Sequence, residues 1–160
     1  MDQIIVRKAS LTDLETLLRF EQGVIEAERP FDSTLKPGHI HYYDLEEMIV
    51  APHIEIVVAQ LEDEVIGSGY ARIETSKPYL KHQKHAYLGF MYVDPNHRGK
   101  GVNQKIIEVL KQWSIAQGIT EMRLDVYVNN MTAIKAYEKA GFTKHIVEMR
   151  MNLDPEMEIP

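Results

Sequence analysis

Two spacings of apolar residues alternate along this chain, and they predict two kinds of element. Short apolar runs bounded by turn-forming residues are typical of strands, and apolar residues three or four positions apart are typical of helices. The first pattern predicts strands over residues 3–9, 54–61, 64–74, 86–93, 122–128 and 142–153. The second predicts helices over residues 11–28, 41–50, 102–117 and 131–140. We therefore expect an α/β protein of the α+β type.

The order of these elements predicts how the strands pair. Only Glu62 and Asp63 separate the strands at 54–61 and 64–74, which is a hairpin length and implies antiparallel pairing. Residues 86–141 read strand, loop, helix, strand, helix, and such a crossover predicts two parallel strands. We expect one twisted, mixed and mostly antiparallel sheet with a central parallel pair and helices on both faces.

Composition limits the kind of protein that this sequence can form. A length of 160 residues with 44% hydrophobic residues fits a single folded domain, residues 1–160. No apolar run approaches the ~18 residues of a membrane span, and the first ten residues do not resemble a signal peptide, so we expect a cytoplasmic protein without a membrane partner. The absence of cysteine excludes disulfides and thiolate chemistry, and the net charge of −6 argues against a nucleic-acid partner.

A basic turn with two glycines joins the strand at 86–93 to the helix at 102–117. It reads Arg98-Gly99-Lys100-Gly101. Unpaired N–H groups at a helix N-terminus attract phosphate, and glycine lets an anion approach the backbone closely. The turn lacks both the phosphate loop of nucleotide hydrolases and the three-glycine dinucleotide fingerprint. It predicts a local anion site, although a plain connecting turn would explain the same residues.

The helix at 131–140 places four residues on one face, namely Asn130, Ala133, Ile134 and Tyr137. The small Ala133 would let a ligand approach the helix, and Asn130 can cap the helix or bond an amide. The phenol of Tyr137, with an ordinary pKa near 10, could protonate a basic leaving group such as a thiolate. Core packing of an amphipathic helix would explain Tyr137 as well.

Together the two motifs resemble the GNAT superfamily of N-acetyltransferases. They are Val-Asp-Pro-Asn-His-Arg-Gly-Lys-Gly-Val at 93–102 and Asn130-x-x-Ala133-x-x-x-Tyr137-x-x-x-Gly-Phe ending at 142. The resemblance implies acetyl-coenzyme A bound in a split between the strands at 86–93 and 122–128, with a bulge near Gly89. It implies that Tyr137 protonates the departing sulfur. It assigns cofactor contacts to Met91, Tyr92, Val93, Arg98, Gly99, Lys100, Gly101, Val102, Asn103, Asn130, Ala133 and Tyr137. Asn103 departs from the family pattern, which has Gly or Ala there.

No motif marks the acceptor site or a general base. The strand at 86–93 carries no acidic residue, so the base must come from elsewhere. The candidates are Glu21, Glu26, Glu28, Glu74, Asp125 and His85. We favour Glu28, which lies beside the helix break at 29–32, where this family usually builds its acceptor wall. Tyr42, Tyr43 and His41 could line the same wall, and we take Tyr42 as a further acceptor contact. His39 and His41 could suggest a metal pair, but no third ligand accompanies them, and we expect no metal.

These observations predict an N-acetyltransferase that moves acetyl from acetyl-coenzyme A to a primary amine by direct attack on the thioester. A non-catalytic acyl-coenzyme A sensor, or another phosphate-binding protein, would share the glycine turn. The sequence leaves open whether the acceptor is a small molecule or a peptide, although the acidic net charge favours a cationic one. A homodimer is compatible with the sequence.

Overall fold

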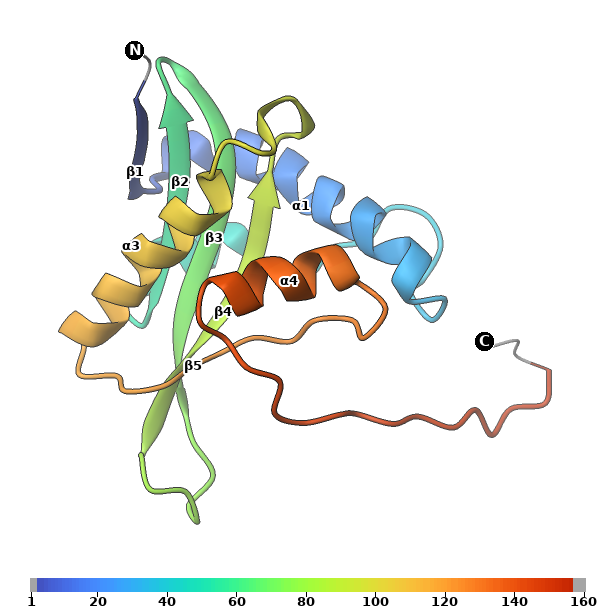
Figure 1. The fold of residues 1–160 in the computed structure, drawn as a ribbon. Helices are drawn as coiled ribbons and strands as arrows, with labels where there is room; N and C mark the ends of the chain where they lie inside the picture. Colours follow the sequence, from blue (N-terminus) through green and yellow to red (C-terminus); the bar gives the residue numbers. More distant parts are fainter. Residues whose placement is uncertain (1–2, 157–160) are drawn as a thin grey trace.

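The computed structural model describes residues 3–156 and has one five-stranded sheet with helices on both faces (Figure 1). The strands, in spatial as well as sequence order, are β1 (Ile4–Lys8), β2 (Ile54–Leu61), β3 (Glu64–Thr75), β4 (Lys84–Val93) and β5 (Met122–Arg123). The first three pairings are antiparallel and β4 pairs with β5 in parallel. The predicted mixed, mostly antiparallel sheet is confirmed. The parallel pair was expected in the centre of the sheet, but among the described residues it forms one edge, because β5 has no second neighbour there.

Each of the four predicted helices is present. They are α1 (Leu14–Glu28), α2 (Leu45–Val50), α3 (Val102–Ala116) and α4 (Met131–Lys139). α1 begins later than expected because residues 11–13 form a 3-10 turn, which starts with a capping box between Ser10 and Asp13. α2 is shorter than predicted because Asp44 caps it, its side chain accepting a hydrogen bond from the backbone of Glu47 at 3.2 Å. No described helix is long and apolar enough to cross a membrane.

The sheet separates two apolar cores. One lies between the sheet and the pair α1 and α2, and includes Leu17, Phe20, Leu45, Ile49, Ile56, Val58, Tyr70 and Phe90. The other lies under α3 and includes Val57, Ile66, Ala71, Leu88, Val102, Ile106, Ile107 and Leu110. Alternate residues of β2 therefore enter opposite cores, as the two-residue period of a strand requires.

Two predicted strands differ in the structure. The strand expected at 122–128 pairs over only Met122 and Arg123, and the chain then leaves β4. The segment 142–153 forms no strand, because no other described segment supplies its ladder of hydrogen bonds. An alternating sequence becomes a strand only beside a partner, so its pattern alone could not decide the outcome.

A β-bulge bends β4 one residue after the glycine that suggested it. Tyr70 faces Gly89 and Ser68 faces Tyr92, so Phe90 and Met91 together oppose a single residue of β3. Phe90 takes up the bulge with φ of 55°, while its side chain is buried. Gly89 is needed beside it, because a Cβ there would lie 2.5 Å from the ring of Tyr70.

A buried glutamate on α1 holds the loop that follows this helix. Glu21 is fully buried, and its side chain is 2.7 Å from Nδ1 of His41. Its other oxygen accepts hydrogen bonds from the backbone N–H groups of Tyr42 and Tyr43 at 2.9 and 2.8 Å. Three hydrogen bonds to one buried side chain fix the position of the segment 41–43 against α1. Glu21 is thus a structural residue rather than a free base.

We expect Glu21→Gln to lower the free energy of unfolding by about 1–3 kcal/mol, because the variant loses the buried negative charge that accepts the two backbone N–H groups and keeps only one acceptor oxygen. Urea denaturation measures this loss. The matched control is Glu15→Gln on the exposed side of the same helix, which should leave the stability unchanged. Equal stability of the two variants would contradict the structural role of Glu21.

Candidate active site

The parallel strands part after two residue pairs, and this leaves one side of β4 open. Ala86 and Tyr87 pair with β5, whereas no pairing with β5 is present along residues 88–93 of the described chain. β4 remains anchored by its side chains. The Tyr92 ring packs on Phe20 with a centroid distance of 4.5 Å, and Met91 packs in the core under α3. Residues 88–93 of β4 therefore have backbone N–H and C=O groups that are free of β5 and can form hydrogen bonds with an extended ligand.

The basic turn is built as the sequence predicts for an anion site. Gly99 and Gly101 both have left-handed backbones, with φ of +80° and +77°, which explains why glycine occurs at each. No atom lies within 4 Å of a Cβ placed on either glycine, so the turn is open to solvent. No side chain caps the N-terminus of α3, and Arg98 and Lys100 are exposed beside it. The following Val102 is buried and fixes the helix start in the core.

The first turn of α3 is tied directly to α4. Nε2 of Gln104 donates a hydrogen bond to the backbone oxygen of Ala136 at 3.1 Å. Asn103, which departs from the family pattern, is half-buried one position earlier. The glycine turn and the Asn130–Tyr137 helix are thus held in a fixed relation. Sequence reasoning missed Gln104, because an isolated glutamine in a helix gives no signal of its long-range partner.

The helix α4 has Asn130 at its start and Ile134 and Tyr137 on the face that packs against the rest of the protein. Oδ1 of Asn130 accepts a hydrogen bond from the backbone N–H of Ala133 at 3.2 Å, so the predicted capping role of Asn130 is confirmed. Ile134 is buried and anchors the helix. The Tyr137 ring packs edge-on against Phe142 with a centroid distance of 6.0 Å and borders the core under α3. The Tyr137 ring therefore has a packing role, but its hydroxyl forms no hydrogen bond with a described residue.

The negative charge of Glu28, the last residue of α1, acts on four tyrosines from three segments of the chain. Burial raises the pKa of Tyr137 to about 12, and the negative charge of Glu28 is the second cause. The same charge adds to burial in raising the pKa values of Tyr42, Tyr43 and Tyr127. The pKa of Glu28 is itself raised, chiefly by burial. Glu28 therefore interacts electrostatically with both Tyr42 and Tyr137, which the sequence suggested as an acceptor contact and as the acid.

Asp32 and Phe31 join this group of tyrosines through Tyr127. The Tyr127 hydroxyl donates a hydrogen bond to Oδ2 of Asp32 at 2.9 Å, and its ring stacks on Phe31 at 6.2 Å. The Tyr42 hydroxyl is buried and forms no hydrogen bond with a described residue. Burial, followed by the negative charge of Glu28, raises the pKa of Tyr42. Sequence reasoning missed Tyr127 and Asp32, since they are far apart in the chain and neither lies in a motif.

The other candidate bases have structural partners. Glu26 pairs with an adjacent arginine. Glu74 contacts an arginine and His85, which also bonds a buried serine. Asp125 accepts a hydrogen bond from a tyrosine hydroxyl at 3.2 Å. Neither Asp125 nor Glu28 forms an ion pair in the part of the chain that the structure describes, but burial raises the pKa of Glu28.

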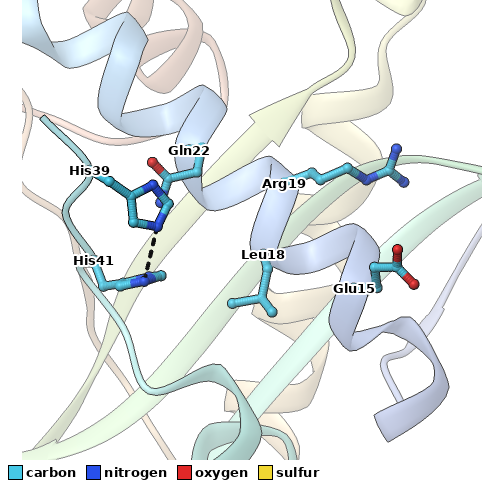
Figure 2. A pocket seen from close by; sticks show the side chains of 6 residues that line it. All are labelled: Glu15, Leu18, Arg19, Gln22, His39 and His41. Atoms are coloured by element: carbon cyan, nitrogen blue, oxygen red, sulfur yellow. Dashed lines mark hydrogen bonds between the residues drawn. The ribbon is translucent and has the colours of Figure 1, made fainter.

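A shallow hollow of about 450 Å³ lies elsewhere, on the outer side of α1 (Figure 2). Its lining residues are Glu15, Leu18, Arg19, Gln22, His39 and His41. Nε2 of His39 is 3.2 Å from Nε2 of His41, and a dashed line marks this contact in Figure 2. These two histidines lack a third ligand, and no group of three or more potential metal ligands occurs among residues 3–156. Neither Glu28 nor any of the four tyrosines on which its charge acts lines this hollow.

Comparison with known proteins agrees with this geometry. The model of the acetyltransferase (GNAT) family matches residues 20–142. The chain is 27% identical over 128 residues to the aminoglycoside N(6')-acetyltransferase type 1 of Salmonella enteritidis, a match covering 74% of this chain and 84% of that protein. It is 38% identical over 58 residues to the streptothricin acetyltransferase of Escherichia coli, covering 36% of this chain but only 33% of that protein.

A solved structure shares the fold. A predicted acetyltransferase from Clostridium acetobutylicum, determined with acetyl-CoA, superposes with a TM-score of 0.74 at 17% identity, covering 94% of this chain and 97% of that one. The family match spans most of the sequence and contains both motifs, and the observed sheet has the parted parallel strands that the motifs imply. This protein belongs to the acetyltransferase (GNAT) family.

Proposed function

We propose that this protein transfers the acetyl group of acetyl-coenzyme A to a primary amine of a small cationic acceptor. The proposal rests on three features that occur together in this fold. They are the open glycine turn before α3, the half of β4 that does not pair with β5, and the acidic residue Glu28 with its neighbouring tyrosines. A relative that aligns over most of its own length acts on the N(6') position of an aminoglycoside, which supports an amine acceptor.

The residues of the turn fit a pyrophosphate. The uncapped N–H groups at the start of α3, with Arg98 and Lys100, supply donors and positive charge in a chain whose net charge is −6. The absence of a Cβ at Gly99 and Gly101 leaves room against the backbone. Val102 and Asn103 belong to the same turn and contribute backbone groups.

The pantetheine arm would follow the open side of β4. We assign it to the backbone of Met91, Tyr92 and Val93, where β5 supplies no hydrogen bonds. The small Ala133 leaves room for it on the facing side of α4. The amide nitrogen of Asn130 is a further donor, since only its oxygen is used in capping. The bound cofactor supplies the thioester, whose sulfur leaves as a thiolate.

Tyr137 and Glu28 form a coupled acid and base in this proposal. The raised pKa of Tyr137 keeps its hydroxyl protonated at neutral pH, so it has a proton for the departing sulfur. Part of that rise comes from the charge of Glu28. When Glu28 accepts the proton of the amine, its charge disappears and Tyr137 becomes a stronger acid. Proton uptake by one residue thus assists proton release by the other.

The acceptor would lie against the acidic and aromatic side of the site. Glu28 and Asp32 carry carboxyl groups, and the hydroxyls of Tyr42 and Tyr127 lie beside them. Carboxylates attract an ammonium group, and aromatic faces bind cations and sugar-like carbon skeletons. This chemistry favours a small cationic amine over an acidic acceptor.

The direct test is a panel of amines with acetyl-coenzyme A, including aminoglycosides, polyamines, amino acids and a peptide N-terminus. Release of free thiol and mass detection of the acetylated amine report turnover. We expect acetylation of at least one cationic small amine. Tight binding of coenzyme A without acetylation of any amine would favour the acyl-coenzyme A sensor. Absence of binding would favour a different phosphate ligand.

Gly101→Glu is expected to abolish binding of coenzyme A in calorimetry, because it places a side chain and a negative charge in the turn. The matched control is Gly118→Glu. Gly118 also has a left-handed backbone, with φ of +78°, and its Cβ position is equally open, but it lies after the other end of α3. Parental affinity in folded Gly101→Glu would remove this turn from the cofactor site.

Tyr137→Phe keeps the ring that packs on Phe142 and deletes the hydroxyl. We expect turnover to fall about 10²–10⁴-fold, the usual contribution of a positioned acid. Affinity for coenzyme A should barely change. Tyr79→Phe, at an exposed tyrosine, serves as the control and should retain parental turnover. If Tyr137→Phe turns over as fast as the parent, its role is packing alone.

Glu28→Gln tests the base through the pH profile. Glu28 accepts a proton only when it is ionised, so the rate of the parent should rise with pH through its raised pKa. The variant should lose this limb and turn over more slowly. If Glu28 only attracts the acceptor, the acceptor KM rises and the profile keeps its shape. The control is Glu26→Gln on the exposed side of the same helix, and parental kinetics of Glu28→Gln at every pH would exclude both roles.

A further inference from the structure

A buried serine of β3 is bonded to the bulge of β4. Ser68 is fully buried, and its Oγ donates a hydrogen bond to the backbone oxygen of Phe90 at 3.1 Å. Phe90 takes up the bulge, and the register pairs neither Phe90 nor Met91 with a residue of β3. The side chain of Ser68 therefore supplies a hydrogen bond at the point where the ladder between the two strands is interrupted.

The backbone of Phe90 has a conformation that needs such support. Among the described residues other than glycine, only Glu62 and Phe90 have a positive φ, and both values are 55°. Glu62 lies in the turn between β2 and β3, whereas Phe90 lies inside a strand. A left-handed backbone is unfavourable for a residue with a bulky side chain, so it persists only where the surroundings fix it. Such strained positions concentrate at functional sites.

The hydrogen bond from Ser68 sets the direction of one peptide group. In a planar trans peptide, the C=O of one residue and the N–H of the next point in opposite directions. Because Ser68 holds the Phe90 oxygen toward β3, the N–H of Met91 points away from β3. That side of β4 is the one that β5 leaves after Tyr87. The N–H of Met91 is thus directed to the open side of β4.

Side chains on both faces of the sheet hold the same peptide. Met91 packs in the core under α3, and a Cβ placed on Gly69 of β3 would lie 2.7 Å from its sulfur. The Phe90 ring is buried in the other core, on the side of α1 and α2. With one end anchored in each core and its oxygen bonded to Ser68, the Phe90–Met91 peptide has little freedom to rotate.

We propose that Ser68 is a positioning residue for acetyl transfer. Its hydroxyl holds the Phe90–Met91 peptide so that the Met91 N–H donates a hydrogen bond to the acetyl oxygen of the thioester. This inference rests on the function proposed above and adds to it a residue of β3 that lies in neither sequence motif. Ser68 does not contact the substrate, and it acts only through the backbone of β4.

The orientation of this N–H matters because charge develops on the acetyl oxygen. The amine nitrogen bonds to the carbonyl carbon, the C–S bond breaks, and its electron pair leaves with the sulfur. Glu28 takes the proton of the amine, and Tyr137 gives its proton to the sulfur. During this exchange the acetyl oxygen carries extra negative charge, and a donor that is already oriented stabilises this charge without reorganisation.

Ser68→Ala tests the role of the hydroxyl in turnover. We expect kcat to fall about 10²-fold, the usual loss when a group near the reacting atoms is misplaced by about 1 Å. The acceptor KM and the affinity for coenzyme A, which lacks the acetyl oxygen, should not change. A kcat equal to that of the parent would show that Ser68 only satisfies a carbonyl in the core.

The matched control is Ser114→Ala. Ser114 is also buried, and its Oγ donates a hydrogen bond to the backbone oxygen of Leu110 at 2.8 Å within α3. This variant loses the same kind of bond as Ser68→Ala, but away from the bulge, so we expect it to keep the parental kcat. Equal losses of kcat in the two folded variants would overturn the proposal, because both would then reflect a general loosening of the core.

Nuclear magnetic resonance of protein labelled with ¹⁵N-methionine tests the direction of the Met91 N–H without turnover. The chain has 8 methionines, and the signal of Met91 is the one that Met91→Leu removes. In the parent we expect acetyl-coenzyme A to shift this signal more than coenzyme A does, and in Ser68→Ala we expect this difference to disappear while both ligands still bind. Equal shifts with the two ligands in the parent would contradict the proposal. If both ligands bind but no amine is acetylated, the proposed function fails, whereas this signal still decides whether Met91 contacts the acetyl oxygen.

Discussion

The incomplete pairing of β4 is the constraint on which the rest of the site depends. One side of this strand is paired to β3 along most of its length, with a bulge at Phe90, while the other side meets β5 at only Ala86 and Tyr87. Side chains of the free half-strand are fixed in two separate cores. The backbone can therefore remain unpaired without losing its position, which a flexible loop could not achieve.

The two helices beside this opening add the chemistry. α3 presents an uncapped N-terminus after a glycine turn, and α4 presents Tyr137, while Gln104 joins the two helices. On the other side, Glu21 holds the segment that carries Tyr42 and Tyr43, next to the end of α1 at Glu28. Buried structural hydrogen bonds thus set the positions of the residues whose charges act on one another. The raised pKa values of Glu28 and Tyr137 follow from this arrangement, with burial as the main cause.

Local patterns predicted most elements of this fold, and long-range contacts decided the rest. Helical spacing located α1, α3 and α4, and the glycines of the turn are explained by their left-handed backbones. The strand predicted at 142–153 is absent because strand formation depends on a neighbour that the pattern does not reveal. The partnership of Tyr127 with Asp32 spans 95 positions and leaves no trace in local sequence. Only the resemblance of the motifs at 93–102 and 130–142 to one family predicted that these two distant segments form a common site.

Amide hydrogen exchange, measured with and without acetyl-coenzyme A, tests most directly whether the parted strands and the glycine turn form the cofactor site. We expect slower exchange on addition of acetyl-coenzyme A in three segments, residues 88–93, 98–105 and 130–137. Exchange of the backbone amides of residues 15–22, the part of α1 that lines the outer hollow, should be unaffected. Unchanged exchange in all three segments at saturating ligand, or protection confined to the residues that line the α1 hollow, would show that the cofactor binds elsewhere.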